Sequence, residues 1–296
     1  MKISVQLRAT VGAVAFGMLA LAVTPAAAQT YQQAVQATNP EAYFRLTDPA
    51  AGSTNGSYNT TYQGSVATGA GAPLASDPGN TGAVFDGVNN GNPGMISTSL
   101  SGGVPGMGTI LAWVNLAALP GTTGTFQYVA GESQGGNDFD LQFETDNALR
   151  FYTGGGENTA FTADPTTLVG QWHLIAATYD STLGSNSFRD IYWDGALGAG
   201  YTGVVNGADK SSPFTIGYSS AFGGREFDGS IDEVAVYNRA LSASDISAIY
   251  AARLNTGTVA GVPEPASWAM MIFGFGMIGA GLRFRRRRTA VRYTPA

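Results

Sequence analysis

The sequence predicts one all-β sandwich domain, closed by a short helix and placed between a removable signal segment and a membrane-anchoring tail. Three observations favour this fold class. The 296 residues include 41 glycines, 11% aromatic residues and only 12% charged residues, a composition typical of many short strands joined by tight turns. Runs of four to eight β-branched and aromatic residues recur between Gly, Asn, Asp and Pro. No internal repeat and no long helical periodicity interrupts these runs.

Residues 1–28 have the features of a secretory signal peptide. Two basic side chains lie within the first eight residues, and a helical apolar run follows at 9–23. This run is too short to span a bilayer comfortably. Ala26 and Ala28 supply the small side chains that signal peptidase requires. We therefore expect signal peptidase to cleave after Ala28 and the mature chain to be exported.

Seven runs in the middle of the chain are the clearest strand predictions. They lie at 109–116, 139–143, 148–153, 172–179, 189–193, 214–218 and 230–237. Turns are expected at the Asp-Gly or Asn-Gly pairs 194–195, 206–207 and 228–229, because such pairs adopt the positive φ that tight hairpins need. The strands should therefore be short and connected mainly by hairpins.

One helix is predicted where the domain ends. Ser242 can cap its N-terminus, and Asp245 follows three residues later in the arrangement of a capping box. Ile246, Ile249 and Tyr250 share one face of that helix. We expect this apolar face to close one end of the sandwich.

Charge and cysteine content exclude several classes of function. Residues 29–261 carry 7 basic and 20 acidic residues, a net charge of −13. Nucleic acid is therefore not an expected partner, because phosphate contacts need clustered Lys and Arg; calcium or a neutral sugar suits this charge better. The absence of cysteine excludes disulfides, Cys-ligated zinc, iron–sulfur clusters and a thiol nucleophile.

The C-terminal part begins with a Gly- and Thr-rich linker at 253–261, which follows the predicted domain at 29–252. Two prolines then extend the backbone, an apolar stretch of about 17 residues reaches the lower limit for a spanning helix, and arginines favour the cytoplasmic side. The residues that carry these three parts are Val262, Pro263, Glu264 and Pro265; Trp268, Met270, Met271, Gly274 and Gly276; and Arg283, Arg285, Arg286, Arg287 and Arg288.

This tail, residues 262–288, resembles a PEP-CTERM sorting signal, with its Pro-Glu-Pro motif, transmembrane helix and arginine cluster. The resemblance implies processing by an exosortase, a membrane cysteine protease of Gram-negative bacteria that make exopolysaccharide. It implies an inner-membrane precursor that later reaches the periplasm, the cell surface or the extracellular matrix. Residues 289–296 would form a cytoplasmic tail that is longer than usual.

Six stretches of the domain together resemble a known family. They are NPEAYFRL near the start, VFDG at 84–87, TILAWVN at 109–115, WHLIAATYD at 172–180, IYWDG at 191–195 and FDGSIDEVAVYNRALSASDISAIY at 227–250. In order and spacing they resemble the laminin G-like jelly roll of the concanavalin A-like lectin and glucanase superfamily. The resemblance implies a jelly roll of two antiparallel sheets, usually extracellular, that binds carbohydrate or protein and often calcium.

An acidic strand is the main candidate site. Strand alternation sends Asp138, Asp140, Gln142 and Glu144 to one face of the predicted strand and the apolar residues between them to the other. The carboxylates could ligate calcium, contact another ligand, act as an acid/base pair on a glycosidic bond, or form a plain solvated face. A separation of about 13 Å between Asp140 and Glu144 exceeds the roughly 5–10 Å of glycosidase pairs. We therefore expect no catalytic residues.

Histidine and aromatic residues add weaker candidates. His173 is the single histidine, which excludes a site with several histidines, and we expect it to pack in the core. Tyr152, Tyr201, Tyr218 and Phe222 lie in or near predicted loops, where an aromatic ring could stack on a sugar.

The sequence as a whole predicts an exported surface protein that binds or builds and does not catalyse. Exopolysaccharide is the favoured ligand, and this choice comes from the two family resemblances, because a fold does not determine a function. A protein-adhesion or matrix module is the first alternative, and a glycan hydrolase is the second. No cofactor is required by the sequence, and calcium stays open.

Overall fold

The computed structural model describes residues 28–257 and 271–277, with gaps at 51, 89–90, 104–105 and 134. The chain divides into the unit Ala28–Thr258 and a second unit made of the two terminal segments. Most of the predicted signal and sorting residues lie outside the described residues: Ala26, the motif at 262–265, Trp268, Met270 and the arginines from 283 onward. Met271, Gly274 and Gly276 belong to a helical stretch at 271–277.

Eight strands form one antiparallel sheet. They are β1 (Ala42–Phe44), β3 (Ala67–Ala70), β4 (Thr81–Asp86), β6 (Met107–Leu116), β11 (His173–Asp180), β12 (Phe188–Trp193), β13 (Ala196–Thr202) and β15 (Asp228–Tyr237). The order across the sheet is β13-β12-β11-β6-β15-β4-β3, and β1 pairs with β15. Strands distant in sequence are therefore neighbours, as a sandwich with long connections requires.

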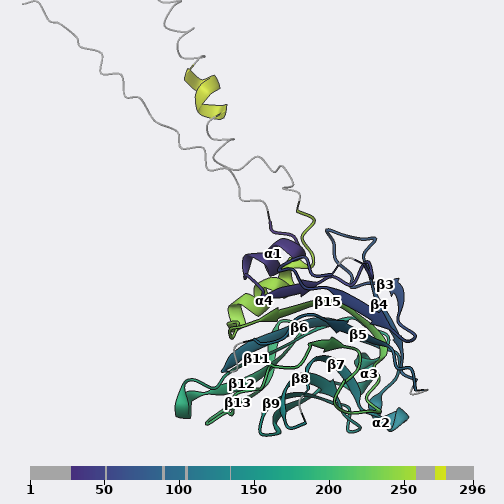
Figure 1. Ribbon diagram of the computed structural model, residues 1–296. Coiled ribbons are helices and arrows are strands. Elements are labelled where there is room, and N and C mark those ends of the chain that lie inside the picture. The colour runs from purple at the N-terminus through teal and green to yellow at the C-terminus, as the bar shows by residue number, and fades with distance from the viewer. Residues whose placement is uncertain are drawn as a thin grey trace, which may run out of the picture. The chain divides into compact units, whose positions relative to one another are not determined.

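Seven strands form the second antiparallel sheet. They are β2 (Thr60–Gln63), β5 (Met95–Thr98), β7 (Gln127–Glu132), β8 (Asn137–Phe143), β9 (Ala148–Gly154), β10 (Glu157–Thr162) and β14 (Thr215–Ile216). Their order is β10-β9-β8-β7-β14-β5-β2. The two sheets stack face to face (Figure 1), which confirms the predicted all-β sandwich of two antiparallel sheets.

Within the described part of the unit Ala28–Thr258, helices are few and short. They are α1 (Tyr31–Ala37), α2 (Pro120–Thr123), α3 (Pro165–Leu168), the 3-10 turn η1 (Gly184–Asn186) and α4 (Ala243–Ala252). The Ser242 capping box of α4 is confirmed, and Ile246 and Ile249 are buried. Among the described residues no helix has both the length and the apolar character needed to cross a membrane, so the predicted anchor at 266–282 stays a prediction.

The eight-stranded sheet is covered on both faces. Along β6, Ile110 and Val114 point into the cluster between the sheets, while Leu111 and Trp113 point outward into a second cluster. Helices α1 and α4 supply the other half of that second cluster, and Tyr31 packs on Trp113 with ring centroids 6.1 Å apart. Figure 1 shows both helices over this sheet. In the part of the chain that the structure describes, no such helical layer covers the outer face of the seven-stranded sheet.

Three sequence predictions differ from the structure. The strand predicted at 214–218 shortens to the two residues of β14. The pair 206–207 lies in the long connection from β13 to β14 and forms no hairpin. The pair 228–229 begins β15 and forms no turn. A Cβ on Gly229 would lie 2.1 Å from the Asn115 carbonyl oxygen. Close approach of β6 therefore explains this glycine, whereas the turn at 194–195 is confirmed by positive φ at both residues.

Candidate ligand-binding site

A cavity of about 380 Å³ lies on the outer face of the seven-stranded sheet, and strand β8 forms its floor. Alternation along β8 sends Phe139, Leu141 and Phe143 into the core between the sheets. The polar residues between and beyond them line the cavity: Asp138, Asp140, Gln142 and Glu144. The structure thus brings together the three carboxylates that the sequence singled out, and it does so through one strand.

The neighbouring strand β9 supplies the next wall. It follows β8 through a turn in which Asn147 has a φ of 64°, and the register places Tyr152 opposite Asp140. Residues directly opposite in an antiparallel pair have adjacent side chains, so the Tyr152 ring stands beside the acidic floor. Gly136 and Gly156, whose backbones are joined by a hydrogen bond, complete this side.

Asp140 is the buried centre of the cavity. Its side chain is 1% exposed, and the Ser133 hydroxyl donates to Oδ2 at 2.7 Å. The other oxygen, Oδ1, has no hydrogen-bond partner among the described residues. Burial, followed by the charge of Asp138, raises the pKa of Asp140 to about 7. Gly131 lies opposite on β7, where a Cβ would come within 2.4 Å of the Asp140 Cβ, so the absence of a side chain there gives Asp140 its space.

Glu144 is held by neighbours on three sides. Tyr152 Oη donates to Oε1 at 2.5 Å, Gln142 Nε2 donates to the same oxygen at 3.1 Å, and Arg150 Nη1 donates to Oε2 at 2.8 Å. Burial, followed by the hydrogen bond to Glu144, raises the pKa of Tyr152, so the phenol keeps its proton at neutral pH. Both oxygens of Glu144 therefore have donors, and Glu144 holds the side chains of Tyr152 and Gln142 in place. Asp140, in contrast, has one oxygen without a donor among the described residues.

Arg225 forms the side opposite Tyr152. Its Nη1 donates to Gln142 Oε1 at 2.8 Å, and its guanidinium lies 4.2 Å from the ring centroid of Phe222 and 5.1 Å from that of Phe126. A second hollow of about 510 Å³ shares these three residues with the cavity. The two hollows therefore adjoin each other at these three side chains.

Of the four aromatic residues considered from sequence, the structure brings two to the cavity. Tyr152 and Phe222 line it. Tyr201 is exposed on the edge strand β13, where Arg189 lies over its ring, and Tyr218 is not among the lining residues. Sequence reasoning did not single out Arg225 or Phe126; a basic residue beside an aromatic one in a Gly-rich loop was the available signal.

Calcium does not fit the residues of the cavity. In the described part of the chain, no three His, Asp or Glu side chains are arranged to hold a metal ion. Calcium takes six to eight oxygen ligands, yet both oxygens of Glu144 and Oδ2 of Asp140 already accept hydrogen bonds. The interpretation of these side chains as a plain solvated face is also wrong, because Asp140 and Gln142 are buried.

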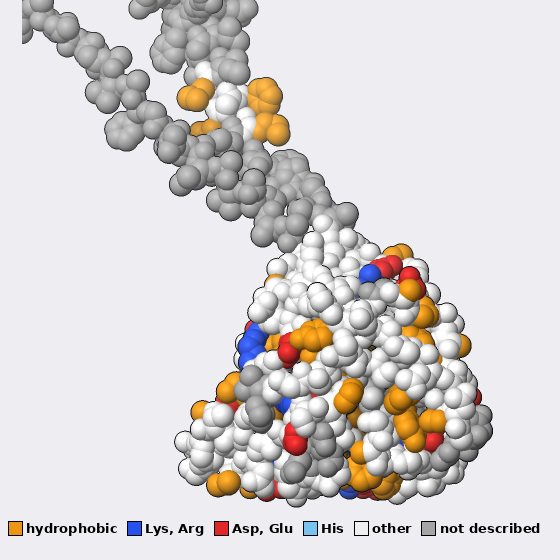
Figure 2. Space-filling view, viewed as in Figure 1, with side chains coloured by type: hydrophobic (Ala, Val, Ile, Leu, Met, Phe, Trp, Pro, Cys, Tyr) orange, Lys and Arg blue, Asp and Glu red, His pale blue; other side chains and the backbone are white. Residues whose placement is uncertain are grey.

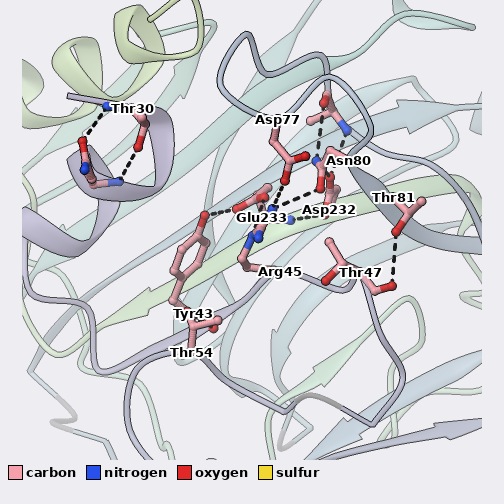
Figure 3. A network of polar contacts seen from close by, with 12 residues as sticks. Thr30, Tyr43, Arg45, Thr47, Thr54, Asp77, Asn80, Thr81, Asp232 and Glu233 are labelled. Atoms are coloured by element: carbon pink, nitrogen blue, oxygen red, sulfur yellow. Dashed lines mark hydrogen bonds and ion pairs between the residues drawn. The ribbon is translucent and has the colours of Figure 1, made fainter. Parts of the chain in front are cut away.

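A second acidic cluster lies on the eight-stranded sheet and is closed (Figure 3). Asp232 Oδ2 accepts from Asn80 Nδ2 at 2.6 Å and from the Ala72 amide at 2.9 Å, and Oδ1 accepts from the Glu233 amide. Arg45 Nε donates to Glu233 Oε1 at 3.1 Å, and the Tyr43 hydroxyl donates to Oε2. Every oxygen of the two carboxylates has a donor, so this cluster holds the fold together.

A bulge in β15 builds that closed cluster. Consecutive strand residues normally point to opposite faces, but the register of β15 against β6 shifts between Asp232 and Ala235, and Glu233 has a φ of 52°. The bulge re-aims side chains, so both carboxylates reach the same network. Regular alternation separates them, which is why sequence reasoning did not find the cluster.

His173 has the packing role expected from the sequence. Its Nδ1 lies 2.9 Å from Asp194 Oδ2, its Nε2 lies 3.0 Å from the Thr167 carbonyl oxygen, and its ring centroid is 4.5 Å from that of Trp193. Burial lowers the pKa of His173, but the hydrogen bonds to Asp194 and Thr167 outweigh burial and leave the pKa raised. Both ring nitrogens are therefore used in holding the turn at 194–195.

Several solved structures share the fold. Domain 4 of AbnA, a GH43 extracellular arabinanase from Geobacillus stearothermophilus in complex with arabinotriose, is 17% identical with a TM-score of 0.52 over 71% of this chain and 98% of that one. The receptor binding domain of botulinum neurotoxin type G is 12% identical with a TM-score of 0.54, over 72% of this chain and 51% of that one. This chain thus spans about half of that toxin chain. At these identities the likeness shows the fold alone.

Family models match both parts of the sequence. The model of the PEP-CTERM protein-sorting motif matches residues 261–288. This match indicates that the chain is an exported, membrane-anchored precursor in a Gram-negative bacterium and that an exosortase processes it. No curated protein is significantly similar to the chain in sequence. The model of the concanavalin A-like lectin/glucanases superfamily matches residues 89–247, which is more than half of the 296 residues. The chain therefore belongs to the concanavalin A-like lectin/glucanases superfamily.

Proposed function

We propose that the sandwich is a non-catalytic glycan-binding module of an exported surface protein, with its ligand in the cavity around Asp140. One observation carries the proposal. A buried carboxylate with a free oxygen lies on the floor of a cavity between aromatic side chains. An unpaired buried polar atom is unfavourable, and a ligand hydroxyl or other donor would satisfy it. Exopolysaccharide remains the favoured source of such a ligand.

The rim of the cavity supports a ligand with many hydroxyl groups. Arg225 and Glu144 hold the Gln142 amide from both ends, so its orientation is fixed before a ligand arrives. Phe222 and Tyr152 offer half-buried aromatic surface on either side. Pre-organised polar groups with flanking apolar surface are typical of small-molecule sites.

The position of the cavity in the sandwich supports display at a surface. The two ends of the unit Ala28–Thr258 meet beside α1 and α4, where Asn255 Nδ2 donates to the Gln29 carbonyl oxygen at 2.9 Å. Those helices cover the eight-stranded sheet (Figure 1), whereas the cavity lies on the outer face of the other sheet. Within this unit the cavity therefore lies on the sheet that α1 and α4 do not cover.

The surface composition also favours a glycan over a polyanion. Figure 2 shows few charged side chains on the face it presents, and the Lys and Arg side chains seen there form no extended stripe. A nucleic-acid site needs an extended basic stripe. Two structural neighbours support the choice by what they bind: domain 4 of AbnA is in complex with arabinotriose, and the type C botulinum neurotoxin structure concerns interaction with two ganglioside molecules.

The test is a glycan array probed with residues 28–258, which contain both hydrophobic clusters, in calcium and in chelator. We expect saturable binding to a subset of glycans in both buffers, without release of products. Phe222→Ala should weaken binding about tenfold, because removing an aromatic side chain on which a ring stacks costs about 1–3 kcal/mol of binding free energy for a nucleobase. Tyr201→Ala, an exposed aromatic outside the cavity, should leave binding unchanged. A folded sample that binds no glycan in either buffer would leave the adhesion or matrix alternative, and product release would favour the hydrolase.

A further inference from the structure

We propose that the cavity selects glycans that carry a free amino group, and that a primary ammonium of the sugar binds against Asp140 Oδ1. The inference rests on the proposed glycan function of this site and names its ligand class. It follows from the charge of the cavity, from the absence of a hydrogen-bond donor to Oδ1 of Asp140 among the described residues, and from the way the nearest cation of the protein is held away from that oxygen.

The charges that line the cavity are unbalanced. Asp138, Asp140 and Glu144 face it, and Arg225 is the single lining cation. Arg150 stands behind Glu144 but is shared with Asp146, to which its Nη2 donates at 2.7 Å. Negative charge therefore exceeds positive charge around the space where a ligand would lie, which favours a cationic group over an anionic or neutral one.

The unpartnered oxygen belongs to a buried carboxyl that forms no ion pair among the described residues. A buried ionised carboxylate without a counter-charge is unfavourable by several kcal/mol. A sugar hydroxyl would donate one hydrogen bond to Oδ1 without offsetting the charge. An ammonium would do both, and charge-assisted hydrogen bonds are about twice as strong as neutral ones.

The nearest cation of the protein does not fill this position. The guanidinium of Arg225 donates to Gln142 Oε1 and lies against Phe222, 4.2 Å from the ring centroid. Its place is thus set by an amide and an aromatic ring, and Oδ1 of Asp140 still has no partner among the described residues. The space between Arg225 and Tyr152 is left for a ligand group whose ring contacts these walls and whose ammonium reaches the floor.

Binding should depend on pH through Asp140. The groups that face it are Asp138 and Glu144 from its own strand, Tyr128 from β7, Tyr152 from β9 and Arg225 from the loop before β15. Burial, with a smaller contribution from Asp138, raises the pKa of Asp140 to about 7. As pH rises towards 7 the carboxyl loses its proton and can pair with an ammonium, so the affinity for an amino sugar should rise.

The experiment is isothermal titration of residues 28–258 with three probes at about pH 5.5 and about pH 7. The probes are a chitosan tetrasaccharide, its fully N-acetylated counterpart and tri-lysine. We expect the chitosan probe to bind about tenfold or more tightly than the N-acetylated one, and to bind more tightly at pH 7. Asp140→Asn should remove the preference and the pH dependence, because its amide still accepts from Ser133 but carries no charge. Asp48→Asn, an exposed carboxylate elsewhere, should change nothing.

Each contrary result overturns a defined part of the inference. Equal or tighter binding of the N-acetylated probe, or an unchanged affinity in Asp140→Asn, overturns the amino-sugar selectivity and leaves the glycan function intact. Tri-lysine binding equal to that of chitosan overturns the sugar as the source of the ammonium. If the chitosan probe does not bind while neutral glycans bind on the array, only the selectivity fails; if nothing binds in either experiment, both proposals fail. Thermal melts of the variants show whether each remains folded.

Discussion

Asp140 and Asp232 are similarly buried aspartates on the two sheets of one sandwich, and they differ in how many hydrogen-bond donors reach them. Asp140 is 1% exposed and Asp232 is 0% exposed, and burial is the main cause that raises the pKa of each to about 7. Both oxygens of Asp232 accept hydrogen bonds, whereas Oδ1 of Asp140, a residue that lines the cavity, is buried and has no donor among the described residues. Burial and a raised pKa therefore do not by themselves distinguish a structural carboxyl from a ligand-binding one; the number of donors does.

The layers around the sheets explain the difference. The eight-stranded sheet is covered by α1, α4 and the segment that contains Ala72 and Asn80, and that segment brings donors to Asp232. Among the described residues no such layer covers the outer face of the seven-stranded sheet, where Gln142, Glu144 and Arg150 satisfy one another but Oδ1 of Asp140 has no donor. Where a covering segment supplies hydrogen-bond donors, the carboxylates of an acidic cluster are satisfied within the protein. Where no such segment lies over the cluster, a carboxylate oxygen is left without a donor.

The largest effect should come from removing the cation of the closed cluster. Arg45→Met leaves Glu233, which is fully buried, without its ion pair, and breaking a buried pair costs about 3–5 kcal/mol of unfolding free energy. Arg150→Met is the matched control, because its partners Glu144 and Asp146 are partly exposed and its loss should cost less than about 1 kcal/mol. Urea denaturation of the two variants measures the contrast. Equal losses would show that the closed cluster is no more structural than the open one.

The same substitution should have opposite signs at the two aspartates. Asp140→Asn removes a buried charge that lacks a partner and should stabilise the unliganded domain by about 1–3 kcal/mol near pH 8. Asp232→Asn places an amide NH₂ against backbone and side-chain donors and should destabilise it by about 1–3 kcal/mol. Denaturant melts at fixed pH measure both changes. A loss of stability in both variants would contradict the idea that Asp140 is held for a ligand.

The gain in Asp140→Asn should itself depend on pH. The pKa of Asp140 is raised in the folded state, so the unfolded chain releases this proton near pH 4 and the folded chain only near pH 7. The unfolded state therefore binds fewer protons between these values, and this group lowers wild-type stability as pH rises through the window. The variant should lack that part of the slope and should match the wild type near pH 4. Identical slopes in the two proteins would contradict the assignment of the free carboxyl.

The smallest effect should come from His173, which titrates in a different window. Its pKa is raised in the folded state by Asp194 and the Thr167 carbonyl despite burial, so its contribution is fully present below the unfolded value near 6.5 and is lost as pH rises through the folded value. Asp194→Asn should remove this loss and cost less than about 1 kcal/mol at about pH 6. Thermal melts between about pH 5 and 8 would detect it. No change in slope would mean that the histidine is held mainly by its contact with Trp193.

Much of the fold was predictable because alternation and capping are local. The runs at 109–116, 139–143 and 230–237 became β6, β8 and β15 with small changes at their ends. The capping box at Ser242 also formed as predicted. Helix α1 was not predicted, because its seven residues are too few to show a helical period, and its Tyr31 is buried in a cluster with residues distant in sequence such as Trp113.

The sequence by itself determined which side chains share the acidic face of β8, because a strand alternates with a period of two. It also determined the sorting tail, whose motif is contiguous in the chain. Only the tertiary structure decided which carboxylate stays open. The donor that closes Glu233 comes from Arg45, 188 residues away, and the group that orients Gln142 comes from Arg225, 83 residues away. Hydrogen-bond satisfaction depends on which distant segments fold over a site, so local patterns find the acids but not the free oxygen.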